Sequence, residues 1–106
     1  MNPCEYVKMV REILDNEPRV RERTADEVSD HLSAYSPDQA SALATLLSAA
    51  AASEKDIAAL ESELNAILEL TATGHVTRAH LTQLKEIRLD DLPREICDYV
   101  TDLLEG

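Results

Sequence analysis

Apolar side chains recur every three or four residues along most of this chain, which is the spacing of one face of an α-helix. The longest such stretch runs from 36 to 74 and contains two stripes in succession. The first stripe comprises Ala40, Leu43, Ala44, Leu47, Ala50 and Ala51. The second comprises Ile57, Leu60, Leu64, Ile67 and Leu68. This pattern predicts two consecutive helices that pack against each other as an αα-hairpin.

The residues at the ends of these stripes predict where the two helices begin and end. Ser36 can cap the first helix, with Pro37 at its first position and Gln39 completing a capping box. We expect Ser53 to cap the second helix and Gly74 to close it in the left-handed conformation. The hairpin has more apolar surface than two helices can hide from each other, so we expect neighbours on both sides of it. The side chains predicted to be most buried are Leu47, Leu60, Leu64 and Ile67.

Similar patterns on either side of this stretch predict one further hairpin each. Asn2 can cap a first helix, and the turn from Asp15 to Pro18 begins a second one. Thr77 can cap a short fifth helix, and the turn 89–93 leads into the last one. The positions expected to face inward are Tyr6, Val7, Val10, Ile13 and Leu14, then Val20, Ala25, Val28, Leu32 and Tyr35, then Leu81, Leu84 and Ile87, and finally Leu92, Ile96, Tyr99, Val100 and Leu103.

The composition agrees with one helical domain. The chain has 106 residues, enough for one core but not for two independent ones. It has no Phe or Trp and three Tyr, so its core must be aliphatic, which suits helices more than sheets. We therefore predict that residues 1–106 form one all-α domain of six helices, in three antiparallel hairpins stacked side by side at approximately 3–35, 37–73 and 78–104.

The segment that begins the second helix resembles a known repeat. It reads Asp15-Asn16-Glu17-Pro18-Arg19-Val20-Arg21 and continues to Ala25, Val28 and Leu32. This resembles the opening of the second helix of a HEAT-type repeat, and the resemblance implies a HEAT-like α–α superhelix. Ile57 lies 37 positions after Val20, and Leu68 lies 36 after Leu32, which is near the period of helical repeats. The later hairpins lack the Val-Arg pair, so they are either true repeats or merely similar hairpins.

The net charge of −11 comes from 21 acidic and 10 basic side chains, and acids exceed bases in every third of the chain. Such a surface repels phosphate backbones and acidic lipids and attracts cationic proteins. This disfavours direct binding to nucleic acid or to a membrane surface. No segment has the apolar length of a membrane span, and the N-terminus lacks the pattern of a signal peptide. Cys4 and Cys97 do not suggest a disulfide framework, so we expect two free thiols in a cytoplasmic protein.

No set of residues has the spacing of a catalytic, phosphate-binding or metal-binding motif. His75 and His80 are five residues apart and do not share a helix face, and His31 lies among acids and Tyr35. Cys97 has no histidine near it in the sequence. Small HEAT-like folds include DNA glycosylases, but those need a basic groove to hold DNA. We therefore expect a protein that is not an enzyme and uses neither cofactor nor metal.

One group of charges is more regular than an acidic composition requires. Five acids follow one another at spacings of four, three, four and three in the last helix, namely Asp91, Glu95, Asp98, Asp102 and Glu105. Like charges at these spacings destabilise a helix by about 0.2–0.5 kcal/mol per pair. The line is either an ordinary solvated face or a docking surface for a basic protein, with Tyr99 as an anchor on its border. A weaker cluster lies on one flank of the fourth helix and comprises Glu54, Glu61, Asn65 and Glu69, of which Glu61 and Glu69 are predicted to contribute to docking.

A small, acidic, helical chain with an acidic line and no catalytic motif resembles the immunity proteins with which bacteria neutralise their own toxins. These include the proteins of polymorphic and contact-dependent inhibition systems and, more remotely, the colicin DNase immunity proteins. The paired tyrosines of the colicin family are absent, since Tyr99 is alone. The resemblance implies a stoichiometric inhibitor whose acids meet the lysines and arginines of a cationic toxin, such as a nuclease. The alternative is a HEAT-like adaptor or regulatory module that binds its partner in the groove of the stacked hairpins.

Overall fold

The computed structural model describes all of residues 1–106 and contains only helices and their connections, without any strand. Its elements are α1 (Pro3–Ile13), α2 (Pro18–Asp30), α3 (Pro37–Ser53), α4 (Ile57–Thr71), the 3₁₀ helix η2 (Arg78–Glu86) and α5 (Arg94–Glu105). A single 3₁₀ turn, η1 (Leu32–Ala34), connects α2 to α3. The predicted all-α class and the six predicted helices are confirmed.

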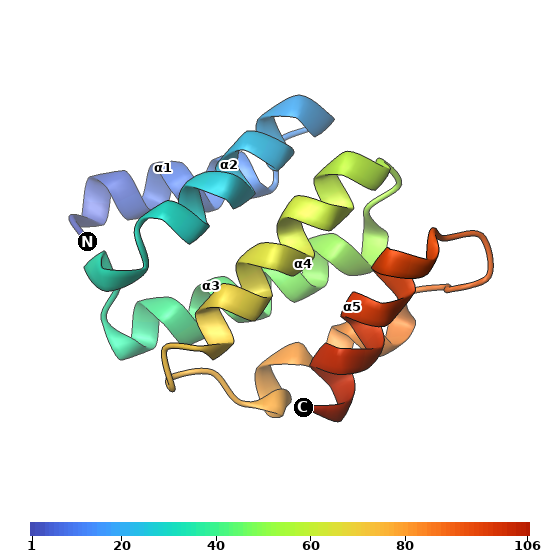
Figure 1. The fold of residues 1–106 in the computed structure, drawn as a ribbon. Coiled ribbons are helices and arrows are strands. Elements are labelled where there is room, and N and C mark those ends of the chain that lie inside the picture. Colours follow the sequence, from blue (N-terminus) through green and yellow to red (C-terminus); the bar gives the residue numbers. More distant parts are fainter.

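Consecutive helices pack in pairs, α1 with α2, α3 with α4 and η2 with α5. Across the pairs, α3 contacts α1 and η2, while α4 contacts α2 and α5. Figure 1 shows the result as two layers, with α2, α4 and α5 nearer to the viewer and α1, α3 and η2 behind them. The middle pair therefore has neighbours on both sides, as its excess apolar surface predicts.

All the α-helices and η2 contribute to one cluster of 20 buried hydrophobic residues. Leu47, Leu64 and Ile67 are completely buried and Leu60 is nearly so. The prediction that these four side chains lie at the centre is confirmed. The core is aliphatic apart from Tyr35, whose hydroxyl donates a hydrogen bond to the backbone oxygen of Val28 at 3.0 Å.

Most of the predicted caps are present. The Gln39 backbone N–H donates to Ser36 Oγ at 3.1 Å, and the Ser36 backbone N–H donates to Gln39 Oε1 at 3.0 Å, which completes the capping box. Asn2 Oδ1 accepts from the Cys4 backbone N–H at 2.8 Å. Gly74 has a φ of 83°, the left-handed value that favours glycine.

The predicted cap at Ser53 is wrong. Ser53 is the last residue of α3, and Asp56 caps α4 by accepting the Ala59 backbone N–H on its carboxylate at 2.9 Å. Alanine has the highest helix propensity of all residue types, so α3 continues through the alanines before Ser53 and ends at Ser53 itself. A carboxylate is also a stronger acceptor for N–H groups at a helix start than a hydroxyl.

The inward face of α4 is rotated from the predicted stripe. Ile57 and Leu68 are each 42% exposed, whereas Ala59, Glu63 and Ala66 are buried. α2 packs more extensively against α4 than any other two elements pack together. The two alanines share a face of α4 with Glu63, which interacts with Arg21 of α2, so these small side chains allow the two helices to come close. In α1, likewise, Val7 and Leu14 are exposed and Met9 and Ile13 are buried, because this outer helix is covered only by α2 and α3.

The fifth helix begins at Arg78, after the predicted cap Thr77, but it is a 3₁₀ helix. The Thr77 backbone N–H donates to His80 Nδ1 at 3.0 Å. Leu81 and Leu84 are buried, and Ile87 is half-buried just after the helix. A spacing of three places side chains in one row when there are three residues per turn. The apolar positions of this segment therefore fit a 3₁₀ helix better than an α-helix.

Candidate docking surface

The acidic line predicted for the last helix is shorter than its spacing suggests. α5 begins at Arg94, so Asp91 is exposed in the preceding turn and does not belong to the helix. Pro93 is the reason, since the residue before a proline is held in extended conformations and the helix cannot run through it. Four exposed acids remain on α5, and we call them the acidic strip: Glu95, Asp98, Asp102 and Glu105.

The packing of α5 turns the acidic strip toward solvent. Ile96, Val100 and Leu103 are buried on the opposite side of the helix, where they join the core. Tyr99 lies between these two faces and is half-buried against the core. Its hydroxyl donates a hydrogen bond to Asn65 Oδ1 of α4 at 3.4 Å.

A hollow of about 270 Å³ lies between α4 and α5, and we call it the α4–α5 hollow. It is lined by Leu68, Glu95, Asp98, Tyr99 and Asp102. α4 and α5 touch over a much shorter length than α2 and α4 do, which leaves this space open. The structure thus brings three acids of the strip, the predicted tyrosine and an exposed leucine to one place.

The acids predicted to form a cluster on α4 differ in position and exposure. Glu61 and Glu69 lie one turn before and one turn after Asn65, on the side of α4 that meets Tyr99. Glu61 is exposed and Glu69 is half-buried, and neither lines the hollow. Glu54 does not belong to this cluster, because it follows α3 and its side chain is buried in an ion pair with Arg21.

The ion pairs of the chain lie away from the acidic strip. Arg19, Arg21 and Arg23 of α2 pair with acids of α1, of α2 and of the turn between α3 and α4, and Arg88 lies 3.9 Å from Asp90. No acid of the strip, nor Asp91, Glu61 or Glu69, is within ion-pair distance of a base. These acids therefore form no ion pair within the molecule, and the base nearest to the end of α5 is Arg78, which donates a hydrogen bond to the Leu104 backbone oxygen at 3.4 Å.

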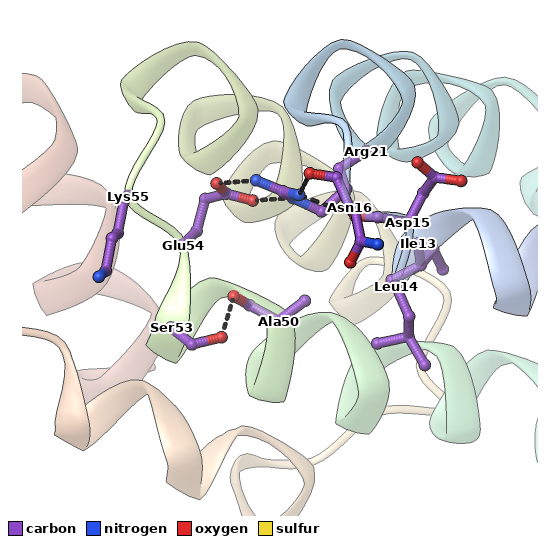
Figure 2. Close-up of a pocket in the computed structure, with 9 residues that line it drawn as sticks. All are labelled: Ile13, Leu14, Asp15, Asn16, Arg21, Ala50, Ser53, Glu54 and Lys55. Carbon is purple, nitrogen blue, oxygen red and sulfur yellow. Dashed lines mark hydrogen bonds and ion pairs between the residues drawn. The ribbon is translucent and has the colours of Figure 1, made fainter.

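The sequence does not single out the buried polar cluster around Arg21. Arg21 Nε and Nη2 donate to the two carboxylate oxygens of Glu54 at 2.6 and 2.7 Å, and Figure 2 shows this forked pair. Nη1 donates to the backbone oxygens of Asp15 and Asn16 at 2.8 and 3.0 Å. These hydrogen bonds occupy most of the guanidinium donors. Arg21 and its partners line a hollow of about 280 Å³ beside α1.

Glu63 of α4 is 1% exposed and lies close enough to Glu54 and Arg21 to interact with both. Neither of its oxygens accepts a hydrogen bond from a neighbouring donor, but the protonated carboxyl lies close enough to Glu54 to donate one to that carboxylate. Burial, together with the neighbouring Glu54 carboxylate, raises the pKa of Glu63 to about 9. Burial also disfavours ionisation of Glu54, but hydrogen bonds from Arg21 and from the Asp56 backbone N–H outweigh it and lower the pKa of Glu54. The sequence does contain a signal, since position 63 lies beside Leu60 and Ile67 by helical angle.

His31, Cys4 and Cys97 are the remaining candidate residues. His31 Nδ1 lies 2.8 Å from the Glu27 backbone oxygen, and Cys4 and Cys97 are free thiols. No group of three or more His, Cys, Asp or Glu side chains is placed to hold a metal ion. No helix is both long enough and apolar enough to cross a membrane. Comparison with protein-family models, curated proteins and solved structures finds no match.

Proposed function

We propose that this protein is a non-catalytic inhibitor of the immunity type, which binds and neutralises a cationic toxin domain through the acidic strip. The observation that carries this proposal is the separation of charges in the molecule. The bases of α2 are paired with acids, whereas the strip is exposed and unpaired beside an exposed leucine and a half-buried tyrosine. Glu61 and Glu69 extend the negative surface along α4, and Asp91 extends it into the turn before α5.

The chemistry of toxins supports the sign of this surface. A nuclease binds phosphate groups through lysines and arginines, so it presents a positive surface at or near its active site. An acidic strip attracts such a surface from a distance, and long-range attraction mainly raises the association rate. An inhibitor that must capture a toxin before it acts benefits most from a high association rate.

Two further points of the proposal rest on separate observations. The free thiols of Cys4 and Cys97 favour the cytoplasm as the site of action, because the cytoplasm keeps thiols reduced. The order of contacts in the two layers favours a HEAT-like relation among the hairpins. That relation also favours the second candidate function, an adaptor that binds a host protein.

A growth assay tests the inhibitor against the adaptor. We expect that the product of the gene immediately upstream arrests growth when it is expressed alone, and that co-expression of this protein restores growth. The double substitution Asp98→Lys and Asp102→Lys should abolish this protection while the protein remains folded. Asp26→Lys with Asp30→Lys is the matched control, because these acids are also exposed, four residues apart on one helix and in no ion pair.

Three results would contradict the proposal. The upstream product could be harmless, which favours the adaptor. Protection could survive the reversal at Asp98 and Asp102, which would reduce the strip to a solvated face. The control at Asp26 and Asp30 could abolish protection equally, which would show that total charge and not the strip is responsible.

A further inference from the structure

The α4–α5 hollow has the dimensions and chemistry of a receptor for one side chain. We propose that it receives an arginine of the basic partner, with the aliphatic part of the arginine against Leu68 and Tyr99 and its guanidinium beside Glu95, Asp98 and Asp102. This inference rests on the proposed function and adds to it the side chain that the surface recognises.

The apolar walls of the hollow are already in place before a partner binds. Leu68 is 42% exposed, although it lies on one of the two helices that contribute most to the core. The Tyr99 ring is held by packing against the core and by its 3.4 Å hydrogen bond to Asn65. A wall that is already ordered loses little conformational entropy when it is covered, so covering it contributes to affinity. Long basic side chains can cover such a wall with their aliphatic parts while the charge stays at the rim.

The acids of the hollow favour arginine over lysine. Glu95, Asp98 and Asp102 lie on successive turns of α5 and have no basic partner. A guanidinium presents five N–H donors in one plane, so it can bond two carboxylates and stack on an aromatic ring at the same time. A lysine ammonium is a compact and strongly hydrated charge, which loses more hydration for fewer fixed contacts.

The hollow has room for one long side chain, since its volume is about 270 Å³. A second hollow of about 400 Å³ shares Leu68 and Asp102 with it and continues past Val76 and Leu103. This second hollow gives room to the partner's residue that neighbours the arginine in its chain. Arg78 lines the second hollow, so a second cation is disfavoured there.

The direct test uses the isotope-labelled full-length protein and three small probes at constant ionic strength. The probes are the N-acetyl methylamides of arginine, lysine and norleucine, and norleucine supplies the lysine stem without its charge. We expect saturable changes in the backbone amide signals of Leu68 and residues 95–102 with the arginine probe, weaker changes with lysine and none with norleucine. Equal binding of the lysine probe would overturn the arginine assignment, and equal binding of norleucine would overturn a role for the acids.

Substitutions in the walls locate the bound probe. Leu68→Ala and Tyr99→Ala should each weaken arginine binding by roughly threefold or more, since each removes part of the wall. Tyr99→Phe keeps the ring and should bind almost as the parent does. Ile57→Ala is the matched control, because Ile57 is also 42% exposed on α4 but does not line the hollow. Unchanged binding in a folded Leu68→Ala variant would overturn the proposed pose.

The two proposals fail in different ways. If reversal of Asp98 and Asp102 abolishes protection in the growth assay but the arginine probe does not bind the hollow, the inhibitor proposal stands and the arginine receptor is wrong. If the arginine probe binds as expected but the reversal leaves protection intact, the receptor is present and the proposed function of the strip is wrong.

Discussion

Replacement of Glu63 by glutamine should stabilise this protein at neutral pH. Glu63 is 1% exposed, and its pKa is raised by this burial, by a hydrogen bond to Glu54 and by the charges of Glu54 and Asp56, and lowered by the charge of Arg21. Burial is the largest of these effects, and the resulting pKa is about 9. The folded protein therefore holds a neutral carboxyl at pH 7, whereas the unfolded chain ionises it. Glutamine has nearly the same shape and carries no proton to lose.

The size of the effect follows from proton linkage. Between the unfolded pKa of 4.5 and the folded pKa of about 9, unfolding releases the Glu63 proton, so this group lowers the free energy of unfolding as pH rises. The slope is about 1.4 kcal/mol per pH unit. At pH 7 the loss relative to pH 4.5 is at most about 3 kcal/mol, and water entry or relaxation around Glu54 reduces it. We expect Glu63→Gln to raise the free energy of unfolding by about 1–3 kcal/mol at pH 7 and by little at pH 5.

Urea unfolding followed by far-ultraviolet circular dichroism, at each pH from 5 to 9, measures this difference. Subtracting the parent from the variant at the same pH removes the contributions of the other acids, including the Glu54–Arg21 pair. Glu61→Gln is the matched control, because Glu61 is exposed two residues earlier on α4, and its difference should stay near zero. A difference for Glu63→Gln that does not change with pH, or that becomes negative above pH 7, would refute the linkage argument.

Three further outcomes follow from the packing and the charges. Leu64→Ala should lower the free energy of unfolding by about 2–5 kcal/mol in urea melts, because Leu64 is completely buried; a loss no larger than that of Leu68→Ala would contradict the central position of α4. Arg21→Met should cost about 3–5 kcal/mol at pH 7, because it leaves Glu54 buried without its partner, and the cost should shrink at pH 4 as Glu54 becomes protonated. In stopped-flow measurements, added salt should slow association with the proposed cationic partner far more than it speeds dissociation; equal changes in both rates would argue against steering by the acidic strip.

The sequence predicts the elements better than their inner faces. The six helices can be predicted from caps and apolar spacing, because both are local features of the sequence that the packing does not change. The inner face of α4 depends on its neighbour instead. A count of apolar residue types places Ile57 and Leu68 inside, but the close approach of α2 selects the face with Ala59 and Ala66 and buries Glu63 with it. A stripe with two small residues and one acid is a weak apolar signal, although the helical angle of position 63 beside Leu60 and Ile67 hints at it, so the packing is needed to identify this face.

The candidate site is likewise only partly predictable from the sequence. The acids of α5 are predictable, because their spacing places them on one face of any helix that contains them. The α4–α5 hollow is not predictable, because it depends on how far α4 and α5 separate and on the exposure of Leu68, which the apolar pattern assigns to the core. Tyr99 is the exception, since its angle between the acidic and buried faces already indicates a border position.

The placement of charge in the two halves of the molecule bears on whether the acidic strip is more than a solvated face. At α2, acids and bases are matched closely enough that even the buried Glu54 has a forked partner. On α5, three successive like-charge pairs remain, namely 95–98, 98–102 and 102–105, at a combined cost to the free helix of about 1 kcal/mol. A basic partner that covers the strip removes this repulsion, and 1 kcal/mol corresponds to roughly a fivefold gain in affinity. The self-repulsion costs the free protein little stability, and a basic partner that neutralises these four acids would turn that cost into affinity, which favours a binding role for them.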